Sequence, residues 1–397
     1  MVAIPEPAVA PRRGVRYMSS MSTQDCDFLI VGAGIAGASA GYNLAARGRV
    51  VILERESQPG YHTTGRSAAF YSETYGNAVI RALTTGSRDF YTNPPAGFTD
   101  QPLLLPLGAI YIAREEQKPA LDKLFADGSR LVDSLRMLGR DEILARVPVV
   151  RPEFAAAGML EPESRSIDVH ALHQGFLRGL RRRGGTVVTD AEVTKAVRQD
   201  ERWLVTTPAG EFTAPVLVNA AGAWCDVLAG IAGARPVGLV PKRRTAIIFA
   251  PPPGVDITGW PIVSDTDEKF YFKADAGKFL ASPADETPME PCDVQPDELD
   301  VAICVDRIES ATTMRVARVE RKWAGLRSFV ADKTIVAGFD PDLAGFFWLA
   351  GQGGYGIQTA PAMGRVVAAL ASHQDLPADI RALGVSAADL SPARFRR

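Results

Sequence analysis

Three glycines and one glutamate near the N-terminus have the spacing of a nucleotide-binding turn. Gly32, Gly34 and Gly37 form a GxGxxG pattern directly after the apolar run 27–31, and Glu54 ends the next apolar run. In such a turn one glycine permits the tight bend, a second lets a pyrophosphate approach the backbone, and the third allows close helix–strand packing. The acid can accept hydrogen bonds from both ribose hydroxyls and disfavours a 2′-phosphate. The pattern therefore predicts binding of FAD or NAD in preference to NADP.

A strand, a helix and a second strand must position these residues. Residues 27–31 (DFLIV) are typical of a strand, residues 38–48 of a helix, and residues 49–54 of the next strand. The helix N-terminus then offers free N–H groups and a partial positive charge to the phosphates. A lone GxGxxG carries little weight, but the strand, the helix and the acid together predict dinucleotide binding.

Later segments are predicted to return to the same nucleotide-binding domain. We expect a helix over 171–185, a strand with its continuation over 186–197, and a strand entering a small-residue turn over 215–224. Residues 345–371 contain a strand, a glycine-rich turn and a long helix, whose N-terminus suits a flavin ring or a phosphate. The chain lacks the regular βα repeats of an NAD domain, which favours FAD.

Two intervening segments, 102–165 and 240–328, show the alternation of polar and apolar residues that is typical of antiparallel strands. We expect them to form one substrate domain built from two insertions. The predicted fold class is α/β, with a Rossmann-like FAD-binding domain and an α+β substrate domain that has a mixed or antiparallel sheet. The FAD-binding domain would be assembled from residues 25–101, 166–239 and 329–392.

Composition limits the class of partner. The 397 residues include 44 Lys and Arg against 46 Asp and Glu, so no global field attracts nucleic acid or an anionic membrane. With 46% hydrophobic residues the chain is globular, and the expected partner is a small molecule. Cys26, Cys225, Cys292 and Cys304 lack CxxC spacing, which predicts neither a metal site nor a disulfide framework.

The sequence shows no membrane-spanning pattern. No apolar run reaches the ~18 residues that span a bilayer, which predicts a cytoplasmic protein without a transmembrane segment. Residues 1–24 are rich in Pro, Arg and Ser and are predicted to be a disordered extension, with a transit peptide as the alternative.

Six motifs occur in a fixed order along the chain: VGAGIAGAS, LERE, GRSAA, NAAGAW, WAGLRSF and GQGGYGIQT. In order and spacing they resemble the D-amino-acid-oxidase superfamily of FAD oxidoreductases, and within it most closely the bacterial D-arginine dehydrogenases. The resemblance extends from about Asp25 to Pro392. It implies noncovalently bound FAD and oxidative deamination of D-amino acids, through an imine, to 2-oxo acids and ammonia.

The resemblance also implies which residues meet the cofactor. Small residues of the GRSAA loop would let it lie against the pyrophosphate and the flavin ring, and Ser67 can donate a hydrogen bond. The expected cofactor contacts are Gly32, Gly34, Ala36, Gly37, Glu54, Arg55, Arg66, Ser67, Ala68, Ala69, Gly222, Gly353, Gly356 and Ile357.

Five residues match substrate-site positions of the family. Arg327 and Tyr271 would hold the substrate carboxylate, because the planar fork of arginine is the best carboxylate anchor and a tyrosine hydroxyl can assist. Arg244 would contact the product, Gly354 would offer its carbonyl to the amine, and Tyr75 would close over the substrate. Without the resemblance, each residue has a structural explanation. Arg327 could form an ion pair, Arg244 could lie on an exposed face, and the two tyrosines could pack in the core.

The expected reaction moves a hydride from Cα to flavin N5, and no side chain stands out as a base. His170 and His173 are predicted to cap a helix or lie on its surface, and His62 to form a hydrogen bond in the cofactor region. The substrate amine would therefore bind neutral, and the rate should rise with pH through its ionisation.

Two positions depart from D-arginine dehydrogenase. Ala109 replaces a glutamate that pairs with the substrate guanidinium, and Phe70 replaces a histidine. Both changes make the pocket more apolar, and an unpaired buried guanidinium costs roughly 3 to 5 kcal/mol. We therefore expect a preference for neutral or hydrophobic D-amino acids, unless Glu73 or Asp265 reaches into the pocket.

Two other functions stay open at this point. The first is an FAD oxidase or dehydrogenase of N-methyl amino acids, glycine or 2-hydroxy acids. The second is a flavin-binding protein without catalysis that serves as an interaction module. The electron acceptor, a quinone or another compound including O2, is not predicted by the residues.

Overall fold

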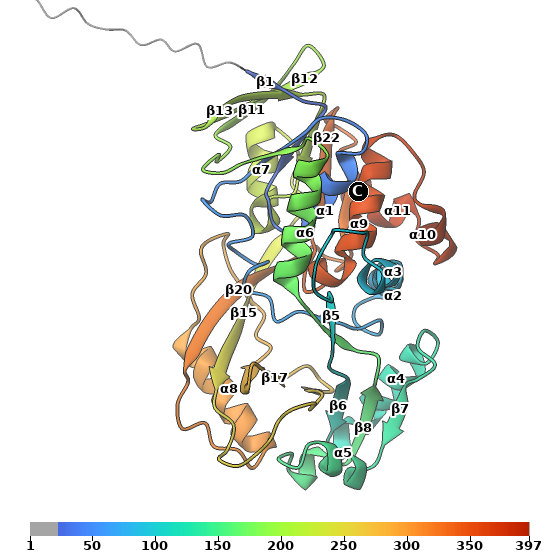
Figure 1. Cartoon of the computed structure of the whole chain (residues 1–397), viewed down its shortest axis with the longest axis vertical. Helices are drawn as coiled ribbons and strands as arrows, with labels where there is room; N and C mark the ends of the chain where they lie inside the picture. Colours follow the sequence, from blue (N-terminus) through green and yellow to red (C-terminus); the bar gives the residue numbers. More distant parts are fainter. Residues whose placement is uncertain (1–22, 397) are drawn as a thin grey trace, which may run out of the picture.

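The computed structural model describes residues 23–396, which form two large β-sheets surrounded by helices (Figure 1). In the first sheet, adjacent strands are parallel except for the last pair. Parallel strands are buried on both faces, which explains continuous apolar runs such as FLIV and VVIL. In spatial order its six strands are β10 (Thr186–Val188), β3 (Val50–Leu53), β2 (Phe28–Val31), β14 (Val216–Asn219), β22 (Phe346–Ala350) and β21 (Val336–Phe339).

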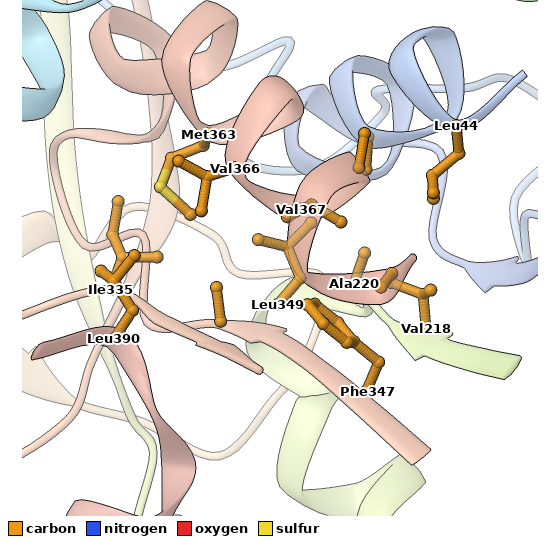
Figure 2. Close-up of a cluster of buried hydrophobic side chains, with 14 of the residues drawn as sticks. Leu44, Val218, Ala220, Ile335, Phe347, Leu349, Met363, Val366, Val367 and Leu390 are labelled. Atoms are coloured by element: carbon orange, nitrogen blue, oxygen red, sulfur yellow. The ribbon is translucent and has the colours of Figure 1, made fainter. Parts of the chain in front are cut away.

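Helices cover one face of this sheet. α1 (Ile35–Leu44) packs on both α9 (Gly356–Ala371) and α6 (Val169–Arg182). The core between sheet and helices includes Phe347 and Leu349 of β22 and Val367 of α9, which Figure 2 shows side by side. Because the N-termini of α1 and α9 both follow strands of this sheet, both helices begin at the same sheet edge.

A four-stranded sheet covers the other face. Its strands are β1 (Gln24–Asp25), β13 (Gly210–Ala214), β12 (Arg202–Thr207) and β11 (Lys195–Gln199). Leu29 of β2 and Trp203 of β12 lie in one hydrophobic cluster with Leu228 of α7 (Cys225–Ala232). The first large sheet is thus the middle of three layers.

Two sequence expectations need correction. The strand and its continuation expected over 186–197 are two strands in different sheets, β10 and β11, because the chain turns between them at Asp190, whose φ is 53°. Residues 1–24 were predicted to be one extension, but Gln24 pairs with Phe212 in β1. Residues 1–22 lie outside the described part of the chain.

The second large sheet, in the lower half of Figure 1, contains strands from both intervening segments. The two sets join where β16 runs parallel to β6; the other strand pairs are antiparallel, so the sheet is mixed as predicted. Its strands are β6 (Ala109–Ala113), β7 (Arg136–Leu138), β8 (Ala157–Glu161), β15 (Val240–Phe249), β16 (Ile262–Asp265), β17 (Tyr271–Asp275), β18 (Lys278–Ser282), β19 (Thr287–Pro288) and β20 (Arg321–Phe329).

Helices and a small sheet complete the fold. α8 (Glu298–Ala311) packs against β15, and α4 (Lys118–Gly128) and α5 (Arg140–Arg146) pack against β8. The remaining strands are β4 (Phe70–Tyr71), β9 (Arg165–Ile167) and β5 (Leu104–Pro106), which form a three-stranded sheet. The remaining α-helices are α2 (Ala78–Thr85), α3 (Arg88–Thr92), α10 (Ala378–Ala382) and α11 (Ala387–Leu390). Among the helices of residues 23–396, we find none with the length and apolar character needed to cross a membrane.

Candidate active site

The GxGxxG turn leaves no room for larger side chains. Gly32 has φ +105°, and a Cβ there would lie 2.3 Å from the Ala220 carbonyl oxygen. A Cβ on Gly37 would lie 1.9 Å from the Gly32 carbonyl oxygen. A Cβ on Gly34 would meet only the Thr64 hydroxyl, at 3.3 Å. The first and third glycines therefore allow close backbone packing, whereas space at the second is limited only by the Thr64 side chain.

Glu54 is buried at the end of β3 and supports the same turn. Its Oε2 accepts a hydrogen bond from the Ala33 N–H at 2.9 Å, and its Oε1 accepts one from the Glu56 N–H at 3.1 Å. Each carboxylate oxygen keeps a lone pair for a further donor. Glu54 lines a neighbouring cavity, so it can accept hydrogen bonds from ligand hydroxyls there.

Two adjoining cavities follow this turn. They share lining residues, including Gly34, Thr64 and Gly222, so the two cavities are adjacent. Of the expected cofactor contacts, the first cavity is lined by Gly32, Gly34, Glu54, Arg55 and Gly222, and the second by Gly34, Ala36, Arg66, Ser67, Ala68, Gly222, Gly353, Gly356 and Ile357. Gly37 and Ala69 line neither; Ala69 packs against a hydrophobic core cluster.

Arg55, His62 and Trp224 line one wall of the first cavity. The Arg55 guanidinium lies 4.8 Å from the Trp224 ring centroid, and the His62 ring lies 4.8 Å from the same ring. His62 Nε2 lies 2.9 Å from Glu56 Oε1, so His62 forms a hydrogen bond in the expected region. Trp224 was not predicted as a site residue, although it is part of the NAAGAW motif.

Arg66 joins the GRSAA loop to the second large sheet. Its guanidinium donates to the carbonyl oxygens of Val294 (3.0 Å) and Ala324 (3.2 Å) and forms an ion pair with Asp293. Its own carbonyl accepts a hydrogen bond from Trp323 Nε1 at 2.9 Å. The guanidinium thus fixes the loop, which leaves Ser67 and Ala68 facing the second cavity.

Three expected substrate residues meet beside the second cavity. Arg327 Nη1 donates to the Tyr75 hydroxyl at 3.3 Å. A Cβ on Gly354 would lie 2.9 Å from that hydroxyl and 3.0 Å from Arg327 Nη1. The backbone of Gly354 therefore lies close to both polar groups, and the absence of a side chain keeps the space between them free.

Arg244 and Tyr271 line the same cavity as Arg327. On the paired strands β15 and β20, Arg244 is opposite Gly325 and Lys242 is opposite Arg327, so the two arginines lie on one face. Arg244 Nε donates to the Asp285 carbonyl at 2.9 Å, and its Nη2 lies 3.2 Å from Glu286 Oε1.

The two guanidinium groups influence each other. Burial and the like charge of Arg327 lower the pKa of Arg244. Burial also acts against the charge of Arg327, but Tyr75, Tyr271 and nearby carboxylates outweigh it and raise the pKa of Arg327. Both side chains stay cationic, because arginine is not deprotonated in proteins. The cavity is therefore a suitable place for an anion such as a carboxylate.

Residues 27–370 match the family model described as DAO: FAD dependent oxidoreductase. The chain belongs to this family. Hydrogen cyanide synthase subunit HcnC of Pseudomonas aeruginosa is 24% identical over 404 residues, covering 89% of this chain and 94% of that protein. Resemblance to D-arginine dehydrogenase in particular stays a prediction.

Solved structures share the fold of this FAD-dependent oxidoreductase. L-proline dehydrogenase from P. horikoshii has a TM-score of 0.79 at 18% identity, over 94% of this chain and 99% of that one. Glycine oxidase from Geobacillus kaustophilus has a TM-score of 0.74 at 22% identity, over 89% and 96%. At these identities the likeness shows the fold alone, and the predicted α/β class is confirmed.

The cavities of this FAD-dependent oxidoreductase fit the cofactor of its family. Gln352 lines the second cavity, and its buried Nε2 has no hydrogen-bond partner within residues 23–396, so a polar ligand atom can satisfy it. α9 begins at the same cavity without a side-chain cap, so its N–H groups are also available. Gln352 lies within GQGGYGIQT and could have been predicted from that position. The described residues contain no cluster of His, Cys, Asp or Glu suited to a metal ion.

His173 was expected at a helix cap or on the surface, and this expectation is wrong. It is 4% exposed, and its Nε2 lies 2.8 Å from the Ala33 carbonyl oxygen in the GxGxxG turn. Burial lowers the pKa of His173. His170, by contrast, is exposed. The correction follows from helix periodicity, because His173 shares the buried face of α6 with Leu172 and Phe176.

Phe70 and Ala109, which were expected at the side-chain end of the pocket, line neither of the two cavities. Phe70 and the buried Ala109 pack in one hydrophobic cluster with Tyr271. Glu73 does not reach this cluster, since it accepts hydrogen bonds from Arg88 and from the Tyr71 hydroxyl.

Asp265, the other acid considered, is also engaged elsewhere. It accepts hydrogen bonds from Gln117 Nε2 at 3.0 Å and from the N–H groups of Asp267 and Lys269. Neither Glu73 nor Asp265 is therefore free to take the place of the family glutamate at position 109.

Proposed function

We propose that this FAD-dependent oxidoreductase oxidatively deaminates free amino acids, with a preference for D-amino acids that have neutral or hydrophobic side chains. The observation that carries the proposal is the meeting of Arg327, Tyr75 and Gly354 beside a cavity that Arg244 and Tyr271 also line. Two arginines and two tyrosines recognise a carboxylate, and a backbone carbonyl can accept a hydrogen bond from an amine.

Each group then has a defined task. FAD, when bound, accepts the hydride from Cα. Arg327 and Tyr271 hold the carboxylate, Gly354 orients the neutral amine, and Tyr75 covers the substrate and limits the entry of water. Orientation of this kind replaces a catalytic base, because the neutral amine already supplies the electron pair that forms the imine. Hydrolysis of the imine then yields a 2-oxo acid and ammonia.

The preference for neutral substrates follows from the apolar cluster. Ala109 and Phe70 provide no partner for a cationic side chain, and Glu73 and Asp265 are engaged elsewhere. A buried cation without a partner is strongly unfavourable. D-Arg should therefore be a poor substrate.

The second candidate is oxidation of glycine, N-methyl amino acids or 2-hydroxy acids. The same carboxylate clamp would hold these compounds, and glycine oxidase shares the fold. The two candidates differ in the groups that must fit around the amine and Cα. Stereochemistry and side-chain range therefore distinguish them.

We also propose the predicted domain division, with FAD held by 25–101, 166–239 and 329–392 and the substrate covered by 102–165 and 240–328. The strands of the two large sheets support it. A cytoplasmic location and an acceptor such as a quinone or O2 belong to the same proposal.

Anaerobic mixing of the purified holoenzyme with single D- and L-amino acids, glycine, sarcosine and 2-hydroxy acids tests the function. We expect D-Leu, D-Met and D-Phe to bleach the oxidised-flavin absorbance, and readmission of air reports reactivity with O2. Bleaching by glycine or sarcosine alone would support the second candidate. Bound FAD that no compound reduces would indicate a protein without this catalysis.

A further inference from the structure

Glu161 is a buried carboxylate that the proposed chemistry does not use. It ends β8, is 1% exposed and lies directly opposite Ala109 on β6. Its Oε2 accepts hydrogen bonds from Ser72 Oγ and Thr74 Oγ1, both at 2.8 Å, and its Oε1 accepts one from the Glu73 N–H at 3.2 Å. These three bonds tie residues 72–74 to the second large sheet.

In the part of the chain that the structure describes, no cation compensates this carboxylate. None of the ion pairs formed within residues 23–396 includes Glu161, and burial raises its pKa. Tyr111, on the same face of β6, places a phenol group near Glu161 but no positive charge. Glu73, by contrast, is paired with Arg88 on the other side of the segment. A buried carboxylate without a cation is costly unless hydrogen bonds satisfy it, so the three donors are essential to its placement.

The segment held by Glu161 carries the substrate cover. Thr74 is bonded to Glu161, and the next residue is Tyr75, whose hydroxyl meets Arg327 beside Gly354. The Thr74 side chain also packs against the end of α4, because a Cβ on Gly128 would lie 3.2 Å from Thr74 Cγ2. A shift of Thr74 would therefore move Tyr75 relative to Arg327.

We propose that Glu161 is a positioning residue of the substrate clamp, which holds Ser72 and Thr74 so that Tyr75 stays against Arg327. Glu161 touches neither substrate nor cofactor in this role. The kinetic consequence rests on the proposed amino-acid oxidation, whereas the structural consequence does not.

Two variants separate hydrogen bonding from space filling. Glu161→Gln can preserve all three contacts, because its amide nitrogen can donate to the two hydroxyls while its oxygen accepts from the Glu73 N–H. Glu161→Leu has similar bulk and preserves none. Glu163→Leu, two residues along and exposed, is the matched control.

Steady-state kinetics of the three holoenzymes with the best amino-acid substrate give the first test. Arg327 binds the carboxylate and Tyr75 covers the substrate in both the ground state and the transition state, so displacement of Tyr75 from Arg327 raises KM more than it lowers kcat. We expect Glu161→Leu to raise KM about tenfold, the effect of one or two lost hydrogen bonds to a charged group. Glu161→Gln and Glu163→Leu should stay within about twofold of the parent.

Hydrogen–deuterium exchange of the peptide that covers residues 70–76 gives the second test, which needs no substrate. Exchange should be about tenfold faster in Glu161→Leu and unchanged in Glu161→Gln. If no amino acid is a substrate, the proposed function fails but this exchange difference still decides the role of Glu161. Parent-like KM and exchange in Glu161→Leu, or equal defects in the Gln and Leu variants, would overturn the proposal.

Thr74 offers a second pair of variants if Glu161→Leu does not fold. Thr74→Val removes the hydroxyl at constant shape, and Thr74→Ser keeps it. We expect a raised KM and faster exchange in the valine variant, with near-parent values in the serine variant. Equal behaviour of the two would contradict the proposed role of the Glu161–Thr74 bond.

Discussion

The Tyr75 hydroxyl lies 3.3 Å from Arg327 Nη1, although 252 residues separate them in the sequence. One belongs to the segment after β4 and the other to β20 of the second large sheet. The backbone of Gly354 lies beside this contact, because a Cβ there would be 2.9 Å from the Tyr75 hydroxyl and 3.0 Å from Arg327 Nη1. The fold thus brings an anion-binding group and a covering ring to the same place.

Replacement of Arg327 by Met should reduce kcat/KM for the best amino acid at least about hundredfold, because loss of one partner from a buried charged pair costs roughly 3 to 5 kcal/mol. Arg321→Met is the control, since Arg321 is exposed on the same strand. FAD content, measured from the flavin absorbance of each purified variant, should be unchanged. A variant with normal kcat/KM would remove Arg327 from the substrate site.

Substrate selectivity gives the second prediction. We expect kcat/KM for D-Leu, D-Met or D-Phe to exceed that for D-Arg by at least about tenfold, because a guanidinium in the apolar cluster around Ala109 and Phe70 lacks a partner. Initial rates with an artificial electron acceptor, over a range of each substrate, provide the comparison. A dominant value for D-Arg would contradict the argument, and Glu268→Gln would then test the exposed acid that contributes to the raised pKa of Arg327.

The nucleotide-binding half of the site was largely predictable from local sequence. Gly32, Gly37 and Glu54 act within one strand–helix–strand unit, so their spacing defines their geometry. The apolar runs of β2 and β3 likewise predict strands that are buried on both faces. The position of His173 was also accessible, because the 3.6-residue period places it on the buried face of α6.

The substrate half depends on long-range pairing that a single sequence does not define. Glu161 is opposite Ala109 only because of the register of β6 and β8, and a shift of one residue would turn its side chain to the other face. Thr64 accepts a hydrogen bond from the Ile35 N–H at 3.0 Å across 29 residues, in a segment without regular structure. Such contacts follow from tertiary packing, so no local pattern indicates them.

Gly37→Ala should prevent formation of a stable holoenzyme. Its Cβ would lie 1.9 Å from the Gly32 carbonyl oxygen. Because the atom it would meet belongs to the backbone, it cannot move aside as the end of a side chain could. We expect a loss of about 3 kcal/mol in stability, the upper end of overpacking costs, together with loss of bound FAD. Gly139→Ala is the control, because its Cβ would meet nothing within 4 Å. Thermal unfolding and the ratio of flavin to protein absorbance give the comparison, and a Gly37→Ala variant with full FAD would refute the packing argument.

The pH dependence of kcat/KM tests the absence of a catalytic base. If the neutral amine is the reactive form, kcat/KM should rise about tenfold per pH unit until the amine pKa of the substrate is passed, and then level off. The inflection should move when a substrate with a different amine pKa is used. A profile that is flat from about pH 6 to 10, or an inflection independent of the substrate, would point to a different proton acceptor.

His173 provides a separate pH prediction, for stability. Burial lowers its folded-state pKa below the ordinary histidine value of 6.5, so the folded state disfavours the protonated ring. The unfolded state then binds more protons in acid. The stability that neutral His173 contributes is complete above pH 6.5 and is lost as the pH falls through the folded-state pKa.

His173→Gln can keep the hydrogen bond to the Ala33 carbonyl through its amide N–H but does not titrate. We therefore expect the Tm of the parent to decrease more steeply than that of His173→Gln as the pH falls from about 7 to 5. Because Ala33 lies in the GxGxxG turn, the parent should also release FAD more readily over this range. Parallel Tm profiles for the two proteins would show that His173 is not the group whose protonation weakens this turn.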